Sequence, residues 1–123
     1  MTGSQLSLSL PADTDHDTWW PGGYNVARVT QMVVDEDFVI GTKFDSDLTS
    51  CYQMQGIIIE GDGDRLLRVE FHHDGRATKL FVASFENTVP TVHIFNGITA
   101  TTKYMRVART GDSWVIAHSS DGA

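Results

Sequence analysis

The amino-acid sequence predicts an all-β fold, a sandwich or barrel of antiparallel strands. Short apolar-alternating runs recur along the chain, turn residues such as Asp-Gly and Asn-Gly separate them, and no segment shows a helical period with caps at both ends. Short strands at such spacing are typical of β-sandwiches and barrels. Because a chain of 123 residues is close to the usual domain size, we expect one domain over residues 1–123.

Each run is interpreted as a strand because its apolar residues alternate with polar ones or form a short block between turn signals. Gln5–Leu10 alternates polar residues with leucine and ends at Pro11, which predicts a half-buried strand. The clearest stretch is Tyr52–Asn87, where Asp-Gly turns divide three runs into hairpins. The predicted strands are Gln5–Leu10, Val26–Val34, Phe38–Phe44, Cys51–Glu60, Arg65–His73, Thr78–Glu86, Thr91–Phe95, Ile98–Arg109 and Ser113–His118.

The period of two assigns the side chains of each strand to faces. In Arg65–His73 the core side is predicted to hold Leu67, Val69 and Phe71, and the other side holds three polar residues. We expect one sheet face to collect the polar and aromatic residues of three strands, namely Arg68, Glu70, His72, Arg106, Trp114 and His118. Planar polar groups beside an aromatic ring suit a saccharide, whose hydroxyls need hydrogen bonds and whose C–H faces stack on rings. The alternative is a solvated face with cross-strand ion pairs.

The composition limits the classes of partner. The formal net charge of −7 disfavours nucleic acid, because an acidic surface repels phosphates. No apolar segment is long enough for a membrane-spanning helix, and no signal peptide is visible at the amino end. The one cysteine, Cys51, excludes an intrachain disulfide and a cysteine-based zinc site.

The loop Ala12–Asn25 is the second region of interest. Its Asp13, Asp15 and Asp17 have the alternate spacing that opens a calcium-binding loop, although the remainder of an EF-hand is missing. A calcium site of another kind and an ordinary Asp-rich turn are both open interpretations. The loop also contains three aromatic residues that are candidates for stacking on a ligand, Trp19, Trp20 and Tyr24.

Signals for catalysis are weaker. His72, His93 and His118 lie on different predicted strands and could converge on a metal ion, as in jelly-roll metal centres. A pair of acids for glycoside hydrolysis would come from Glu60, Asp62 or Glu70. No nucleophile elbow is present, so we predict no catalytic residues.

Four segments carry a resemblance to a known family: YQMQGIIIE, D-x-LLRVEFHHDG, KLFVASFEN and YMRVARTGDSWVIAHSSDG. Together they resemble the concanavalin A-like, laminin-G-like β-sandwich modules of the DUF1349 type, which are related to the C-terminal domain of family 43 β-xylosidases. The resemblance spans about Leu6 to Gly122. It implies a jelly-roll sandwich attached to secreted carbohydrate-active or adhesion proteins. Compared with the family, this sequence is shortened at both ends, so exposed sheet edges and a homodimer formed through them are expected.

The sequence therefore predicts a carbohydrate-binding module that recognises a polysaccharide or oligosaccharide. The stacking candidates are Trp19, Trp20, Tyr24 and Trp114, and the polar contacts are Arg68, Glu70, His72, Arg106 and His118. The first alternative is a small sandwich enzyme that acts on polysaccharide with a histidine-bound metal or an acidic pair. The second alternative is a structural or assembly domain.

Overall fold

The computed structural model describes residues 5–9, 26–62, 64–99 and 101–123. The chain divides into two units, Met1–Val34 and Asp35–Ala123. The seven strands found among the described residues belong to the second unit, and these residues contain no helix, hence none that is long and apolar enough to span a membrane.

In the first unit the two predicted strands do not form. Residues 26–34 have no regular structure, and Val29, Met32 and Val34 are exposed. Gln5 forms an isolated bridge, while Leu6 and Leu8 are more than half exposed and continue no strand. An alternating pattern supplies one apolar face, but a strand also needs neighbouring strands for its backbone hydrogen bonds, and the sequence pattern does not reveal whether they exist.

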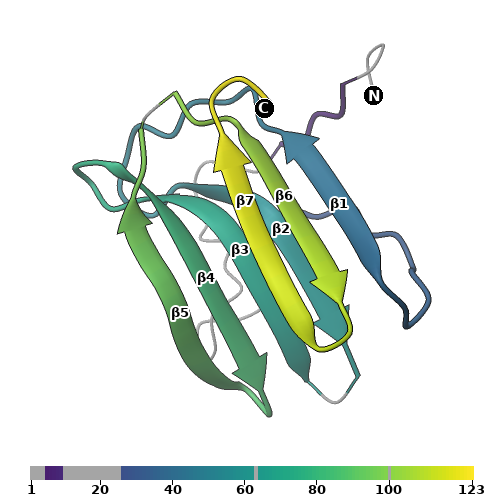
Figure 1. Ribbon diagram of the computed structural model, residues 1–123. Helices are drawn as coiled ribbons and strands as arrows, with labels where there is room; N and C mark the ends of the chain where they lie inside the picture. Colours follow the sequence, from purple (N-terminus) through teal and green to yellow (C-terminus); the bar gives the residue numbers. More distant parts are fainter. Residues whose placement is uncertain (1–4, 10–25, 63, 100) are drawn as a thin grey trace. The chain divides into compact units, whose positions relative to one another are not determined.

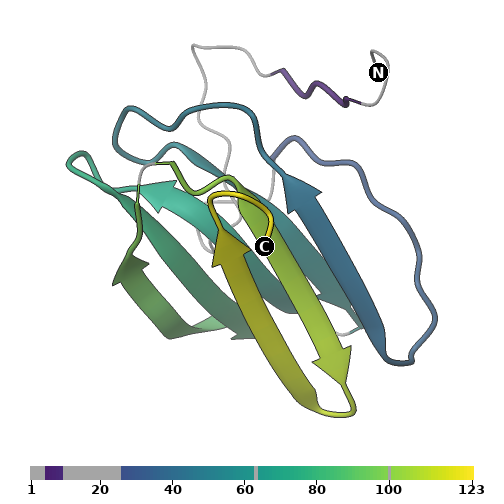
Figure 2. The ribbon, with the colours of Figure 1, turned by 45° about the horizontal axis from the view of Figure 1, so that its top comes forward.

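The second unit is an antiparallel β-sandwich, as predicted (Figure 1). One sheet has three strands in the order β1-β6-β7, and the other has four in the order β2-β3-β4-β5. Figure 2 shows the two sheets as separate layers that face each other. The strands are β1 (Phe38–Lys43), β2 (Met54–Gly61), β3 (Arg65–His73), β4 (Thr78–Glu86), β5 (Val89–Gly97), β6 (Tyr104–Thr110) and β7 (Ser113–Ser119).

The hydrophobic core lies between the two sheets. Val69 and Val107 are fully buried, and Phe71 is 1% exposed. The core joins side chains of both layers: Ile57, Val69, Phe71, Leu80, Val82, Met105 and Val107. The predicted core side of Arg65–His73 is therefore confirmed.

Tight turns fix the order of the four-stranded sheet. Asn87 and Thr88 both have positive φ, 51° and 67°, the conformation of a two-residue hairpin whose twist matches its strands. The strand β5 then begins at Val89 and includes Pro90, two residues earlier than Thr91. Proline is tolerated there because β5 is an edge strand, where a missing N–H donor leaves no ladder bond unmade.

The predicted strand Ile98–Arg109 is wrong in its first part. The strand β6 begins only at Tyr104, because a turn precedes it in which the Thr102 N–H donates to the Thr99 carbonyl at 3.0 Å. The Thr99 and Thr102 hydroxyls also hydrogen-bond at 2.9 Å. Threonine has a high strand propensity, yet its hydroxyl also favours such turns.

The acidic segment 35–37 ahead of β1 contacts the β6–β7 hairpin. The Arg109 guanidinium donates to Asp35 at 2.5 Å, and the Gly111 N–H donates to Asp37 at 2.7 Å. The hydrogen bond and the charge of Asp35 raise the pKa of Arg109. These contacts hold the chain at the start of β1 against the neighbouring hairpin.

Candidate functional site

Arg68, Glu70 and His72 lie together on the outer face of the four-stranded sheet, opposite the core side of β3, as predicted. The Arg68 Nε and Nη2 atoms each donate to one Glu70 carboxylate oxygen at 2.8 Å. The His72 Nδ1 atom lies 3.3 Å from the same carboxylate. The side chains of Arg68 and Glu70 are 4% and 7% exposed. At these positions the sheet face therefore holds a buried ion pair and is not solvated.

Aromatic rings surround this ion-pair cluster, which we define as Arg68, Glu70 and His72. The His72 ring lies 5.7 Å from both Phe81 and Phe95, measured between ring centroids. The Arg68 guanidinium lies 5.5 Å from the Phe81 centroid, within cation–π range. The charged groups of the cluster therefore already have partners within the protein.

A glycine allows the backbone of β2 to approach the ion-pair cluster closely. A Cβ atom on Gly56 would lie 2.0 Å from the Val69 carbonyl oxygen and 2.6 Å from the Glu70 Cα. Only glycine fits opposite Glu70 at this distance. The local sequence is thus adapted to a packed cluster, which points to a structural role for Arg68 and Glu70.

The register of the β6–β7 hairpin places Arg106 on one face of the three-stranded sheet and Trp114 and His118 on the other. Thr110 pairs with Ser113 across a two-residue turn, so Arg106 faces Ala117. Directly opposed residues share a sheet face, which places Trp114 and His118 on the face of Met105 and Val107, toward the core. The prediction of one face holding all six residues is therefore wrong: Arg106 lies on the outer face of the three-stranded sheet, and the ion-pair cluster lies on the other sheet.

The outer face of the three-stranded sheet is a grid of three rows, which we call the Arg106 platform. The pairing gives the rows Lys43–Tyr104–Ser119, Gly41–Arg106–Ala117 and Val39–Ala108–Val115. In the middle row the long Arg106 side chain lies between the small residues Gly41 and Ala117. The last row is apolar and open, with Val39 67% and Val115 59% exposed.

A groove of ≈ 380 Å³ runs over the first two rows. Its lining residues include Gly41, Lys43, Tyr104, Arg106 and Ala117 of the platform, together with His118 and the segment at Gly122 and Ala123. This volume lies within the range of small-ligand sites.

The cations of the groove differ in how they are held. The Lys43 Nζ lies 3.0 Å from Asp45 and 5.7 Å from the Tyr104 centroid, and the hydrogen bond and charge of Asp45 raise the pKa of Lys43. Arg106 is exposed, and its guanidinium has no hydrogen-bonding or ion-pair partner within the described part of the chain. This guanidinium is thus available to a ligand.

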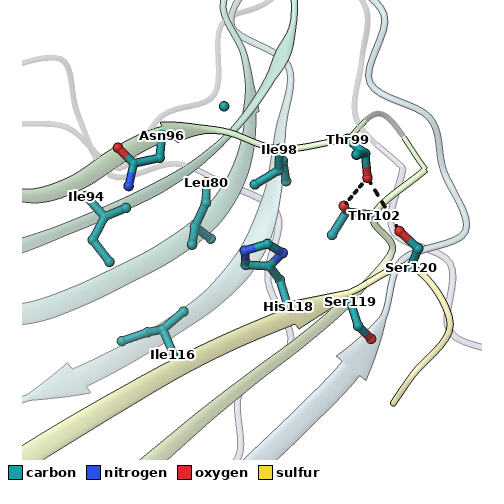
Figure 3. A pocket seen from close by; sticks show the side chains of 11 residues that line it. Leu80, Ile94, Asn96, Ile98, Thr99, Thr102, Ile116, His118, Ser119 and Ser120 are labelled. Atoms are coloured by element: carbon teal, nitrogen blue, oxygen red, sulfur yellow. Dashed lines mark hydrogen bonds between the residues drawn. The ribbon is translucent and has the colours of Figure 1, made fainter.

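Trp114 and His118 occupy the two ends of β7 on its inward face. The Trp114 ring packs edge-on against Phe38 at 5.8 Å and lies 5.9 Å from the Arg109 guanidinium. His118 projects into a cleft of ≈ 810 Å³ between β5 and β7, toward Leu80 and Ile98 (Figure 3). The cleft combines aliphatic side chains of the core with hydroxyl groups at its rim. Of the residues predicted to contact a saccharide, it contains His118.

The three histidines that could have formed a metal site, His72, His93 and His118, lie apart in the structure. His72 is in the ion-pair cluster, His118 lines the cleft, and the His93 Nε2 atom lies 2.7 Å from the Ser84 hydroxyl. Among the described residues no group of three potential ligands could hold a metal ion. The calcium candidates Asp13, Asp15 and Asp17 and the stacking candidates Trp19, Trp20 and Tyr24 lie outside the described residues.

The sequence does not reveal the neighbours of Arg106 on the platform. The sequence pattern places Gly41, Lys43 and Tyr104 in strands but indicates no site there, because their positions beside Arg106 depend on the pairing of β1 with β6. One signal was present in the sequence: a two-residue Gly111-Asp112 turn requires Thr110 to pair with Ser113, which places Arg106 opposite Ala117.

Comparison of this chain with protein-family models, with curated proteins and with solved structures finds no match. The resemblance to DUF1349-type modules therefore stays a prediction from the residues.

Proposed function

We propose that this β-sandwich is a glycan-recognition module and that the saccharide lies on the Arg106 platform. The observation that carries the proposal is the exposed Arg106 guanidinium in a groove beside the Tyr104 ring. Saccharide recognition needs planar hydrogen-bond donors next to an apolar or aromatic surface. The platform supplies both on one open sheet face.

The small neighbours of Arg106 support this assignment. Gly41 and Ala117 flank it in the same row, so no bulky side chain covers the guanidinium from either neighbouring strand. The five donors of a guanidinium suit vicinal hydroxyl groups. The exposed Val39 and Val115 in the next row offer apolar area to the C–H face of a second sugar unit.

The ion-pair cluster is the weaker candidate. Its guanidinium and carboxylate are buried and bonded to each other, and opening a buried ion pair for a ligand leaves charges without compensation. Trp19, Trp20 and Tyr24 stay proposed as additional stacking residues, on the sequence pattern alone.

Isothermal titration against a panel of soluble plant and algal polysaccharides tests the proposal. We expect at least one glycan to bind, and we expect Arg106→Ala to weaken its binding about tenfold or more, the effect of losing a charge-assisted hydrogen bond. The matched control is Arg76→Ala, an exposed arginine in the β3–β4 turn. Absence of binding to every glycan, or equal affinity of the Arg106→Ala variant, contradicts the proposal.

A further inference from the structure

The Arg106 platform is a region of positive charge on an acidic protein. The chain has 16 acidic and 9 basic residues, yet none of the nine outward positions of the platform is acidic and two are cationic. The Lys43 ammonium lies 3.0 Å from the Asp45 carboxylate, so Arg106 is the cation of the platform without an ion-pair partner among the described residues.

Most other described cations have a carboxylate partner. Six ion pairs show this pattern: Lys43–Asp45, Arg65–Glu86, Arg68–Glu70, Lys79–Asp74, Lys103–Asp47 and Arg109–Asp35. In a chain with an excess of acids, Arg106 has no such partner among the described residues. The residues around it are Gly41, Ala117 and Tyr104, which leave the guanidinium unpaired and open.

We infer that the platform recognises an acidic saccharide, with the carboxylate of a uronic acid bound by Arg106. This inference rests on the proposed glycan-recognition function and specifies its ligand class. A guanidinium matches a carboxylate with two parallel N–H···O bonds, a geometry that the Arg68–Glu70 pair of the same protein already adopts. Lys43 lies in the neighbouring row of the same groove, where its charge is paired with Asp45, so Arg106 is the group assigned to the carboxylate.

An acidic protein binds an acidic polymer when a local ion pair outweighs the repulsion between their net charges. The net charge of −7 opposes such binding at long range. At ionic strengths near 0.15 M this repulsion is screened beyond about 8 Å, while a direct pair with Arg106 is not. We therefore expect the affinity to depend on a local contact rather than on the field of the whole molecule.

The experiment compares four ligands of similar length by isothermal titration: oligogalacturonate, its methyl ester, a neutral galactan oligomer and a sulfated galactan oligomer. We expect oligogalacturonate to bind about tenfold or more tightly than the methyl ester and the neutral oligomer. Arg106→Gln should abolish this preference, whereas Arg76→Gln should retain it. Circular dichroism of each variant checks that the fold is intact.

The outcomes separate the inference from the proposed function. Equal affinity for oligogalacturonate and its methyl ester overturns the inference and leaves glycan recognition standing. Tighter binding of the sulfated oligomer also overturns it, in favour of a sulfate ligand. A preference for oligogalacturonate that persists in Arg106→Gln also overturns the inference, because a residue other than Arg106 then binds the carboxylate. Failure of all glycans to bind removes the proposed function itself.

Discussion

Arg68 and Glu70 show how single residues shape the outer face of the four-stranded sheet. Both are nearly fully buried, which carries a desolvation cost of several kcal/mol per ion. Two hydrogen bonds of 2.8 Å, the Phe81 ring beneath the guanidinium and the nearby His72 offset that cost. The desolvation cost of each ion is thus offset only while its partner is present.

We predict that Glu70→Gln lowers the free energy of unfolding by about 3 kcal/mol, because it leaves the buried Arg68 charge without a carboxylate. Urea denaturation followed by circular dichroism measures this change. The matched control is Glu86→Gln, which breaks the exposed Arg65–Glu86 pair of 3.7 Å and should cost less than about 1 kcal/mol. If both variants lose the same small amount, the buried pair is not a stabilising element.

At the scale of elements, the turn between β3 and β4 is held by one carboxylate. The Asp74 Oδ1 atom accepts hydrogen bonds from the Arg76 and Ala77 N–H groups, both at 2.9 Å, and Oδ2 lies 3.2 Å from the Lys79 Nζ. The two backbone hydrogen bonds, followed by the one from Lys79, hold the pKa of Asp74 well below its usual range. The ionised carboxylate is therefore part of the folded turn.

The sign of the resulting pH dependence follows from this shift. Because the pKa of Asp74 is lower in the folded than in the unfolded chain, its stabilising effect is fully present above the unfolded value of about 3.9 and is lost as the pH falls through the lower folded value. We predict that thermal unfolding temperatures of the wild type fall more steeply below pH 4 than those of Asp74→Asn, which keeps an acceptor but no charge. Parallel pH profiles for the two proteins would contradict the prediction.

Elements also differ in how well the sequence predicts them. Arg65–His73 and Thr78–Glu86 have the predicted bounds, because each is a long alternating run closed by an unambiguous turn. Val26–Val34 is equally apolar but forms no strand. A strand therefore needs a pairing neighbour as well as an apolar pattern: hairpins supply it for these two runs, and the distant β6 supplies it for β1.

At the scale of the whole molecule, the sheets of the second unit end in strands with one unpaired side. Among the described strands, β5 ends the four-stranded sheet and β7 ends the three-stranded one, with the ≈ 810 Å³ cleft between them. The edge strand β5 also exposes Val89, Val92 and Phe95. Open edges with apolar residues are prone to pair with another chain.

The expected homodimer stays a prediction, and the exposed edge of β5 offers a way to test it. We predict a mass of twice 13.6 kDa at high protein concentration by light scattering after size exclusion. Val92→Lys should shift the protein toward the monomer, because an edge lysine disfavours strand pairing. The control Thr101→Lys lies between strands and should not change the mass. A monomer at all concentrations contradicts the prediction.

The sequence by itself determined the fold class, most strands of the sandwich and the division of β3 into a core side and a polar side. It could do so because hydrophobic alternation and turn residues are local properties of the chain. Only the tertiary structure showed that Arg68 and Glu70 are buried against each other, that Trp114 and His118 face inward, and that Arg106 stands alone between Gly41 and Ala117. These facts depend on register and on packing between layers, which connect residues far apart in the chain and leave no mark in a local pattern.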